Sequence, residues 1–163
     1  EEVVRILGER GVRSAMVDLG GNISAVGART DGNPWRIGVQ NPDAPRGTTM
    51  GVVEVVNKSV TSSGIYEHYF VQNGRKYHHI MDTRTGFPVD NGLEQVTVIS
   101  DSSFDADSYD TVLFCLGPAE GLKLATSLGL DVIMVSADHR IFATAEARRM
   151  LKLTDTSFSF GAP

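Results

Sequence analysis

The sequence predicts one α+β domain with a mostly antiparallel sheet and helices packed on one side of it. Short strand-like runs are joined by glycine- and asparagine-containing turns, which are typical of hairpins and therefore of antiparallel pairing. Two helical patterns, 104–116 and 119–128, lie together in the second half of the chain instead of alternating with strands. No internal repeat, low-complexity tract or interdomain linker is visible, so we expect a single domain.

Composition limits the class of protein. The 163 residues are 41% hydrophobic and 21% charged, which is ordinary for a globular protein. A net charge of −5 and the lack of a Lys/Arg cluster argue against a nucleic-acid surface. No apolar run is long enough to cross a bilayer, and no signal-peptide pattern is present. The single Cys115 rules out an internal disulfide and a multi-cysteine zinc site, and its apolar surroundings predict a buried packing residue.

The first half of the chain is predicted to begin with a helix and to continue with strands. The helix over 1–10 ends at Gly11 and has no capping residue before it, so we expect the chain to begin inside an element, as a fragment would. The expected strands are 14–19, 23–29, 35–40 and 52–57. The stretch 59–67, rich in Ser, Thr and Gly, is predicted to be a loop. Such a loop either forms turns or holds phosphate with hydroxyls and backbone N–H groups.

The most unusual segment is 77–90, which contains two adjacent histidines, two carboxylates and an arginine. A hairpin with its turn at Asn73-Gly74 leads into it. His78 and His79 therefore arrive at the end of a strand and face opposite sides, since side chains alternate along an extended backbone. One interpretation is a plain hairpin end with Arg84 paired to a carboxylate. The density of ionisable groups favours a functional site.

The second half predicts more helix. After a strand at 95–100 and the two helices, the expected elements are strands 132–136 and 141–144, a short helix 146–151 and a polar tail. His139, in a turn, is predicted to be an exposed bystander. The helix 104–116 is predicted to carry two distinct stripes: one made of Phe104, Ser108, Thr111 and Cys115, and an apolar one made of Tyr109, Val112, Leu113 and Leu116.

Asp107 and Thr111 share a face of this helix because they are four residues apart. A carboxylate and a hydroxyl aligned in this way suit a hard cation such as Mg²⁺, which prefers oxygen ligands. The other interpretation is that Asp105, Asp107 and Asp110 only stabilise the helix N-terminus electrostatically. Spacing alone leaves both interpretations open.

The chain resembles the ApbE family of flavin transferases, the FAD:protein FMN transferases, over nearly its whole length. The resemblance rests on stretches that follow one another in order: 17–22, 62–67, 77–82, 85–88, and Ala106-Asp107 followed by Thr111. It implies an ApbE-like (T-fold-like) fold, of which residues 1–163 are the C-terminal portion. The N-terminal portion of the family's domain would then be absent from this chain. That portion supplies a backbone carbonyl to the metal and part of the flavin-binding wall.

The resemblance implies a site and a reaction. Such enzymes bind FAD with Mg²⁺ and transfer its FMN half to a Ser or Thr hydroxyl of an acceptor protein, releasing AMP. The implied catalytic residue is His79, the cofactor-binding residues are Ser62, Ser63, Gly64, His79 and Ile80, and the metal ligands are Asp107 and Thr111. A neutral histidine is chemically suited to take the proton of the acceptor hydroxyl. Two roles stay open for Asp82: it either orients a histidine or has a structural role.

Other functions remain open from the sequence. With the same residues, an FAD pyrophosphatase would give FMN and AMP, and a non-catalytic domain would only bind flavin. Thr83 stands where the family has a proline, so the loop loses a rigid turn but no ligand. The expected partners are FAD, an acceptor protein with a flavinylation motif, and the missing N-terminal segment. The resemblance favours a membrane-anchored lipoprotein outside the cytoplasm. This chain carries no such signal, and a cytoplasmic location stays open.

Overall fold

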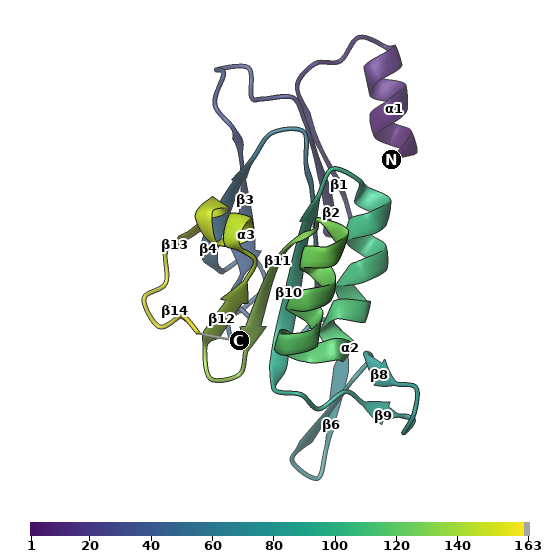
Figure 1. The fold of residues 1–163 in the computed structure, drawn as a ribbon, viewed down its shortest axis with the longest axis vertical. Coiled ribbons are helices and arrows are strands. Elements are labelled where there is room, and N and C mark those ends of the chain that lie inside the picture. The colour runs from purple at the N-terminus through teal and green to yellow at the C-terminus, as the bar shows by residue number, and fades with distance from the viewer. Residues whose placement is uncertain (162–163) are drawn as a thin grey trace.

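The computed structural model describes residues 1–161, and its elements are labelled in Figure 1. In chain order they are α1 (Glu2–Glu9), β1 (Ala15–Leu19), β2 (Asn22–Val26), β3 (Trp35–Gln40), β4 (Thr49–Val55), β5 (Ser59–Gly64), β6 (Tyr69–Gln72), β7 (Arg75–His78), β8 (Met81–Asp82), β9 (Phe87–Pro88), β10 (Leu93–Ser100), α2 (Ser103–Leu128), β11 (Asp131–Ser136), β12 (Arg140–Ala143), α3 (Ala145–Met150), β13 (Leu151–Leu153) and β14 (Ser159–Phe160). The hairpin predicted at 73–74 is present, as are the first helix and the strand 35–40, and the predicted strands 14–19 and 23–29 form a hairpin as β1 and β2.

The central layer is a seven-stranded sheet in the order β1-β2-β5-β10-β11-β12-β14. Every neighbouring pair in it is antiparallel except β12–β14. α2 covers one face, as predicted for the helical second half. A smaller sheet in the order β13-β4-β3, together with α3, covers the other face. The expected α+β class with a mostly antiparallel sheet is therefore confirmed.

Two apolar cores hold these layers together. The core between α2 and the central sheet includes the fully buried Val96, Val98, Phe114 and Met134. The core between the two sheets includes Val39, Met50, Val53, Ile99, Ile133 and Ile141. β10 and β11 are buried along nearly their whole length, because alternate side chains enter opposite cores. None of the helices in residues 1–161 combines the length and the apolar character needed to cross a membrane.

The predicted loop at 59–67 is wrong. Its first 6 residues form β5, a strand inside the central sheet that pairs with β10 on one side and β2 on the other. The hydroxyls that suggested a loop bond across strands: Ser62 Oγ lies 2.8 Å from Thr97 Oγ1, and Ser59 Oγ lies 3.0 Å from Ser24 Oγ. Cross-strand hydroxyl pairs stabilise such a strand. They leave no apolar alternation in the sequence, so the pattern resembled a loop.

α2 joins both predicted helices across a kink at Gly117, whose φ is 76°. Ser102 caps it, its hydroxyl accepting from the backbone N–H of Asp105 at 3.1 Å. The predicted apolar stripe is largely wrong, because Val112 and Leu116 are among the exposed hydrophobic side chains. The residues that α2 buries are Ala106, Asp110, Leu113, Phe114, Gly117, Gly121 and Ala125. Cys115, predicted to be buried, is exposed on the same helix.

The C-terminal residues also depart from the prediction. The supposed polar tail forms β13, which pairs with β4, and β14, which pairs with β12. His139 is not a bystander, because its ring stacks on Phe158 at 4.4 Å and its Nε2 lies 2.6 Å from Oδ2 of Asp43. These contacts tie the turn before β12 to both the C-terminal segment and the loop after β3. Short strands of this kind are specified by their partners more than by their own sequence.

α1 lies apart from both cores. It contributes no buried residue, and its apolar side chains Val3 and Ile6 are 42% and 44% exposed. No side chain caps its N-terminus. Its contact with the rest of the domain includes Glu1, whose carboxylate accepts from the Ser102 hydroxyl and from the backbone N–H of Phe104 at the start of α2.

The two adjacent histidines face opposite sides, as predicted. His79 is exposed, whereas His78 is only 8% exposed and donates from Nε2 to the carbonyl oxygen of Val89 at 3.0 Å. Its ring meets that of Phe114 in an edge-on arrangement with 6.2 Å between centroids. Burial lowers the pKa of His78, so the folded state keeps this imidazole neutral.

This burial predicts a pH dependence of stability. Unfolding releases His78 to an ordinary pKa of about 6.5, so below that pH the unfolded chain binds a proton that the folded chain does not. Stability is therefore lost as the pH falls, by at most about 1.4 kcal/mol per pH unit for one proton. His78→Gln keeps a donor for the Val89 carbonyl but does not titrate, and urea unfolding between pH 7.5 and 5.5 should show a smaller loss for this variant. Equal pH slopes in the two proteins would contradict this assignment.

Candidate functional site

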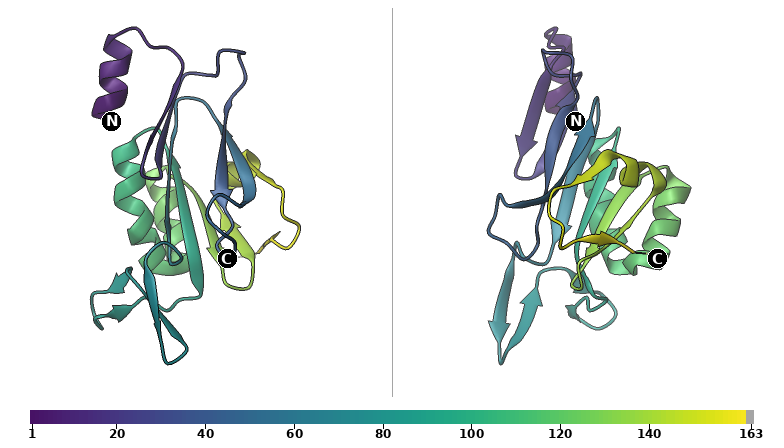
Figure 2. Two further views of the ribbon diagram at one scale, coloured as in Figure 1. Left: turned by 180° about the vertical axis from the view of Figure 1, so that it is seen from behind. Right: turned by 90° about the vertical axis from the view of Figure 1, so that its left-hand side faces the viewer.

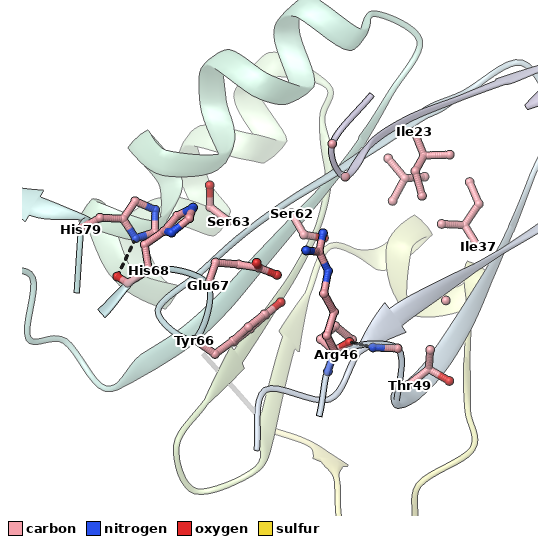
Figure 3. A pocket seen from close by; sticks show the side chains of 17 residues that line it. Ile23, Ile37, Arg46, Thr49, Ser62, Ser63, Tyr66, Glu67, His68 and His79 are labelled. Carbon is pink, nitrogen blue, oxygen red and sulfur yellow. Dashed lines mark hydrogen bonds between the residues drawn. The ribbon is translucent and has the colours of Figure 1, made fainter. Parts of the chain in front are cut away.

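A pocket of about 440 Å³ collects most of the predicted site. Its walls are the β1–β2 turn, the end of β5, the loop between β3 and β4, and the two ends of the β6–β7 hairpin. Figure 3 shows Ile23 and Ile37 at one end of the pocket and the rings of His68 and His79 at the other, with Arg46 between them. The pocket therefore offers apolar surface, a guanidinium and imidazoles in one cavity.

His79 is held in one tautomer. Its Nδ1 lies 3.2 Å from the carbonyl oxygen of His68, and because a carbonyl can only accept, Nδ1 carries the proton. The backbone N–H of His79 donates to the same oxygen at 3.1 Å. The His68 ring packs edge-on against the His79 ring with 5.3 Å between centroids. Nε2 is thereby left as the basic nitrogen, which is the form that a general base requires.

Ser62, Ser63 and Gly64 line the pocket, and they do so from a strand and not from a loop. A Cβ on Gly64 would lie 2.4 Å from the ring of Tyr66, so only glycine lets this ring pack over the strand end. The Tyr66 hydroxyl donates to Oε1 of the fully buried Gln95 at 2.7 Å. Burial raises the pKa of Tyr66, which keeps it a neutral donor and fixes this wall.

Sequence patterns did not mark Arg46, Glu67 or His68 as pocket residues. Arg46 lies in a loop, where nothing local predicts its direction. Its guanidinium is suited to phosphate oxygens. The signal for His68 was available, because extending the register of the hairpin from Asn73-Gly74 places it opposite His79.

The predicted metal ligands lie beside this pocket and not in its lining. Asp107 accepts from the side-chain amide of Asn22 at 2.8 Å, which ties α2 to the start of β2. The Thr111 hydroxyl lies 3.2 Å from that of Ser63, and Ser63 lines the pocket. Thr111 therefore contacts a residue of the pocket lining, whereas the partner of Asp107 directly follows the lining residue Gly21.

Asp110 is a buried neighbour that the sequence did not single out. It is 3% exposed, and its carboxylate accepts from the backbone N–H and, at 3.0 Å, from the hydroxyl of Thr111. Burial raises the pKa of Asp110, and the hydroxyls of Ser63 and Thr111 oppose that rise. These contacts set the orientation of the Thr111 side chain.

The donor atoms suit Mg²⁺. Within residues 1–161 no group of three or more His, Cys, Asp or Glu side chains is placed to hold a metal. A carboxylate from Asp107 and a hydroxyl from Thr111 are hard oxygen donors, and Mg²⁺ is commonly bound by one or two protein carboxylates with substrate phosphates and water. The chemistry of the residues present therefore fits this ion.

Two further residues have structural surroundings. Ile80 is 3% exposed and belongs to the core under α2, and it is not among the residues that line the pocket. Asp82 pairs with Arg84, with Oδ2 2.9 Å from the guanidinium, as in the plain hairpin interpretation. This ion pair lowers the pKa of Asp82. The structure thus gives Asp82 a turn-forming role instead of an orienting contact with a histidine.

Comparison with known proteins gives one consistent family. The model described as the ApbE family matches residues 1–134. A relative from Klebsiella pneumoniae named FAD:protein FMN transferase is 36% identical over 153 residues, which are 93% of this chain and 46% of that protein. One of the same name from Haemophilus influenzae is 33% identical over 162 residues, which are 96% of this chain and 45% of that protein.

Solved structures agree. The ApbE protein of Thermotoga maritima has a TM-score of 0.83 at 26% identity, over 91% of this chain and 48% of that one. The apo form of the flavinyl transferase ApbE from Pseudomonas stutzeri has a TM-score of 0.75 at 34% identity, over 91% of this chain and 47% of that one. The chain spans about half the length of the relatives it matches. From the pocket, the fold and these matches together, it follows that this chain belongs to the ApbE family.

Proposed function

We propose that the complete protein transfers the FMN half of FAD to a Ser or Thr hydroxyl of an acceptor protein and releases AMP. The observation that carries this proposal is His79, with its Nδ1 proton held by the His68 carbonyl and its Nε2 left basic beside the pocket. The family relatives named FAD:protein FMN transferase support it. FAD is then a substrate.

In this reaction the chain's own residues have separate tasks. Nε2 of His79 takes the proton of the acceptor hydroxyl, whose oxygen bonds to the phosphorus on the riboflavin side of the pyrophosphate. The bond from that phosphorus to the bridging oxygen breaks, and AMP leaves with the electron pair. Arg46 binds phosphate oxygens, and Ile23 and Ile37 supply apolar surface for a ring.

Asp107 and Thr111 would hold Mg²⁺, with Asn22 and Asp110 orienting their side chains. When bound, this ion offsets the negative charge of a pyrophosphate. Its remaining ligands would be substrate oxygens, water and groups outside these residues.

One observation favours a second candidate, FAD hydrolysis to FMN and AMP. His79 is exposed, so water can reach the position of the acceptor hydroxyl. Incubating the protein with FAD, Mg²⁺ and an acceptor protein that carries a flavinylation motif separates the two. Covalent flavin on the acceptor supports transfer, and free FMN alone supports hydrolysis. If no AMP appears with or without the acceptor protein, the remaining candidate is a domain that only binds flavin.

We also propose that residues 1–163 are the C-terminal portion of the flavin transferase domain and pack against a further segment of the same protein, separate or continuous. The support is the match to only 46% of the Klebsiella relative and the exposed apolar face of α1, with Val3 and Ile6. As in the family resemblance, the complete protein would be an anchored lipoprotein outside the cytoplasm, which membrane fractionation of cells tests.

The first prediction concerns the metal. Asp107→Ala removes a carboxylate from the proposed Mg²⁺ site, so AMP release should be abolished at ordinary Mg²⁺ concentrations. The circular dichroism spectrum should stay that of the folded protein. Glu120→Ala removes an exposed carboxylate from the distant half of α2 and should leave AMP release unchanged. Full activity of the Asp107 variant, or of the unmodified enzyme in excess EDTA, would contradict the metal assignment.

The second prediction separates the two histidines. His79→Ala should slow FMN transfer by roughly two to four orders of magnitude, because it removes the base. His78→Ala should act mainly on stability, since it deletes a buried ring and its bond to the Val89 carbonyl. Single-turnover transfer and thermal unfolding measured on both variants check this division. Equal and small effects on transfer would refute it.

The third prediction concerns completeness of the site. This chain offers two protein oxygens to the metal, and Mg²⁺ prefers a near-octahedral shell, so residues 1–163 alone should bind FAD at least about tenfold more weakly than the complete protein. Flavin fluorescence and calorimetry with Mg²⁺ present measure both affinities. Equal affinities would show that these residues are sufficient.

A further inference from the structure

The β6–β7 hairpin is a two-stranded ribbon that extends away from the body of the domain in every view (Figures 1 and 2). In residues 1–161 it pairs with no other strand, and all of β6 is exposed. Its base is the rim of the pocket: His68 comes directly before β6, His79 comes directly after β7, and both line the cavity. A segment bound along the ribbon therefore has one end next to His79.

One face of the ribbon forms a continuous track from the pocket outward. Because side chains alternate, Phe70 and Tyr77, which are paired across the strands, lie on the same face as His68 and His79. The rings of Phe70 and Tyr77 stack 5.1 Å apart and nearly parallel. Arg75, two residue pairs farther out and therefore on the same face, places its guanidinium 5.4 Å from the centre of the Tyr77 ring. The order along the track is thus imidazole, aromatic stack, arginine.

The ribbon differs in charge from the rest of the chain. The whole protein carries a net charge of −5, whereas residues 69–79 contain Arg75 and Lys76 and no carboxylate. Phe70 and Val71 are 60% and 61% exposed. An exposed, apolar strand edge is normally covered, because its free N–H and C=O groups can pair with another chain. Arg75 and Lys76 complement the charge of an acidic partner.

We propose that this ribbon is the docking site for the acceptor protein, an inference that rests on the proposed function. An extended acceptor segment adds to the free edge of β6 by backbone pairing, with its reacting hydroxyl at His79. Arg75 reaches across the ribbon face and binds an acidic side chain of that segment. Arg75 begins β7 and His79 directly follows it, four residues apart and roughly 13 Å at about 3.3 Å per extended residue, so the acidic residue lies about four positions from the acceptor hydroxyl.

The test uses the complete enzyme and two forms of one acceptor domain that carries a flavinylation motif. The two forms differ at one position, four residues from the acceptor threonine in the part of the segment that lies along the ribbon. One form has Asp at this position and the other has Lys. For the Asp form, Arg75→Glu should weaken binding and raise the KM, each by about tenfold. For the Lys form, the same substitution should strengthen binding and lower the KM. The kcat and the KM for FAD should not change, because Arg75 touches neither reacting group. Phe70→Ala should raise the acceptor KM for both forms.

Matched controls change the same kinds of side chain elsewhere. Lys123→Glu reverses a charge in the second half of α2, and Leu128→Ala truncates an apolar side chain that is 42% exposed at the end of α2. Both should leave acceptor binding unchanged. A KM effect on FAD instead of the acceptor, equal losses with the Asp and Lys forms, or no effect of Arg75→Glu would each overturn the docking proposal.

Binding separates this proposal from the proposed reaction. Fluorescence anisotropy of the labelled acceptor domain is measured without FAD, so it does not depend on transfer. If the unmodified enzyme attaches no flavin to either form, the proposed function fails. The charge-dependent affinity then still decides whether the ribbon docks the acceptor.

Discussion

The pairing of β5 with β10 is the constraint on which the rest of the structure depends. β10 lies between two cores and is buried along nearly its whole length, so the polar side chains of β5 must find partners across the strands. The Ser62–Thr97 hydroxyl contact and the bond from Tyr66 to Gln95 supply them. The same strand forms a wall of the pocket, meets α2 through Ser63 and leads into the β6–β7 hairpin. A change in its register would displace all three at once.

The site combines groups that come from unrelated parts of the chain. His79 is positioned by hairpin geometry, Arg46 by a loop between two strands of the smaller sheet, and Asp107 by the first turns of α2. Two of them are oriented by a local contact: the His68 carbonyl accepts from the imidazole of His79, and Asn22 at the start of β2 donates to the carboxylate of Asp107. Such preorganisation is what allows charged and basic groups to act without first rearranging.

Local signals in the sequence were sufficient for the parts that local geometry determines. Asn73-Gly74 predicted the hairpin, and alternation along it correctly predicted that His78 and His79 face opposite sides. The strand β5 was missed because its stability comes from partners distant in sequence, and the buried face of α2 was misjudged because Asp110 belongs to it. Arg46 could not have been predicted, since the direction of a loop side chain depends on the tertiary structure.

The N-terminal helix shows how stability is distributed in this molecule. α1 buries none of its residues and meets the start of α2 through the carboxylate of Glu1. Its hydrogen bonds can therefore open without exposing either core, in a local fluctuation much less costly than global unfolding. Within residues 1–161, a molecule that binds α1 would therefore change the order of this helix without having to distort the sheet.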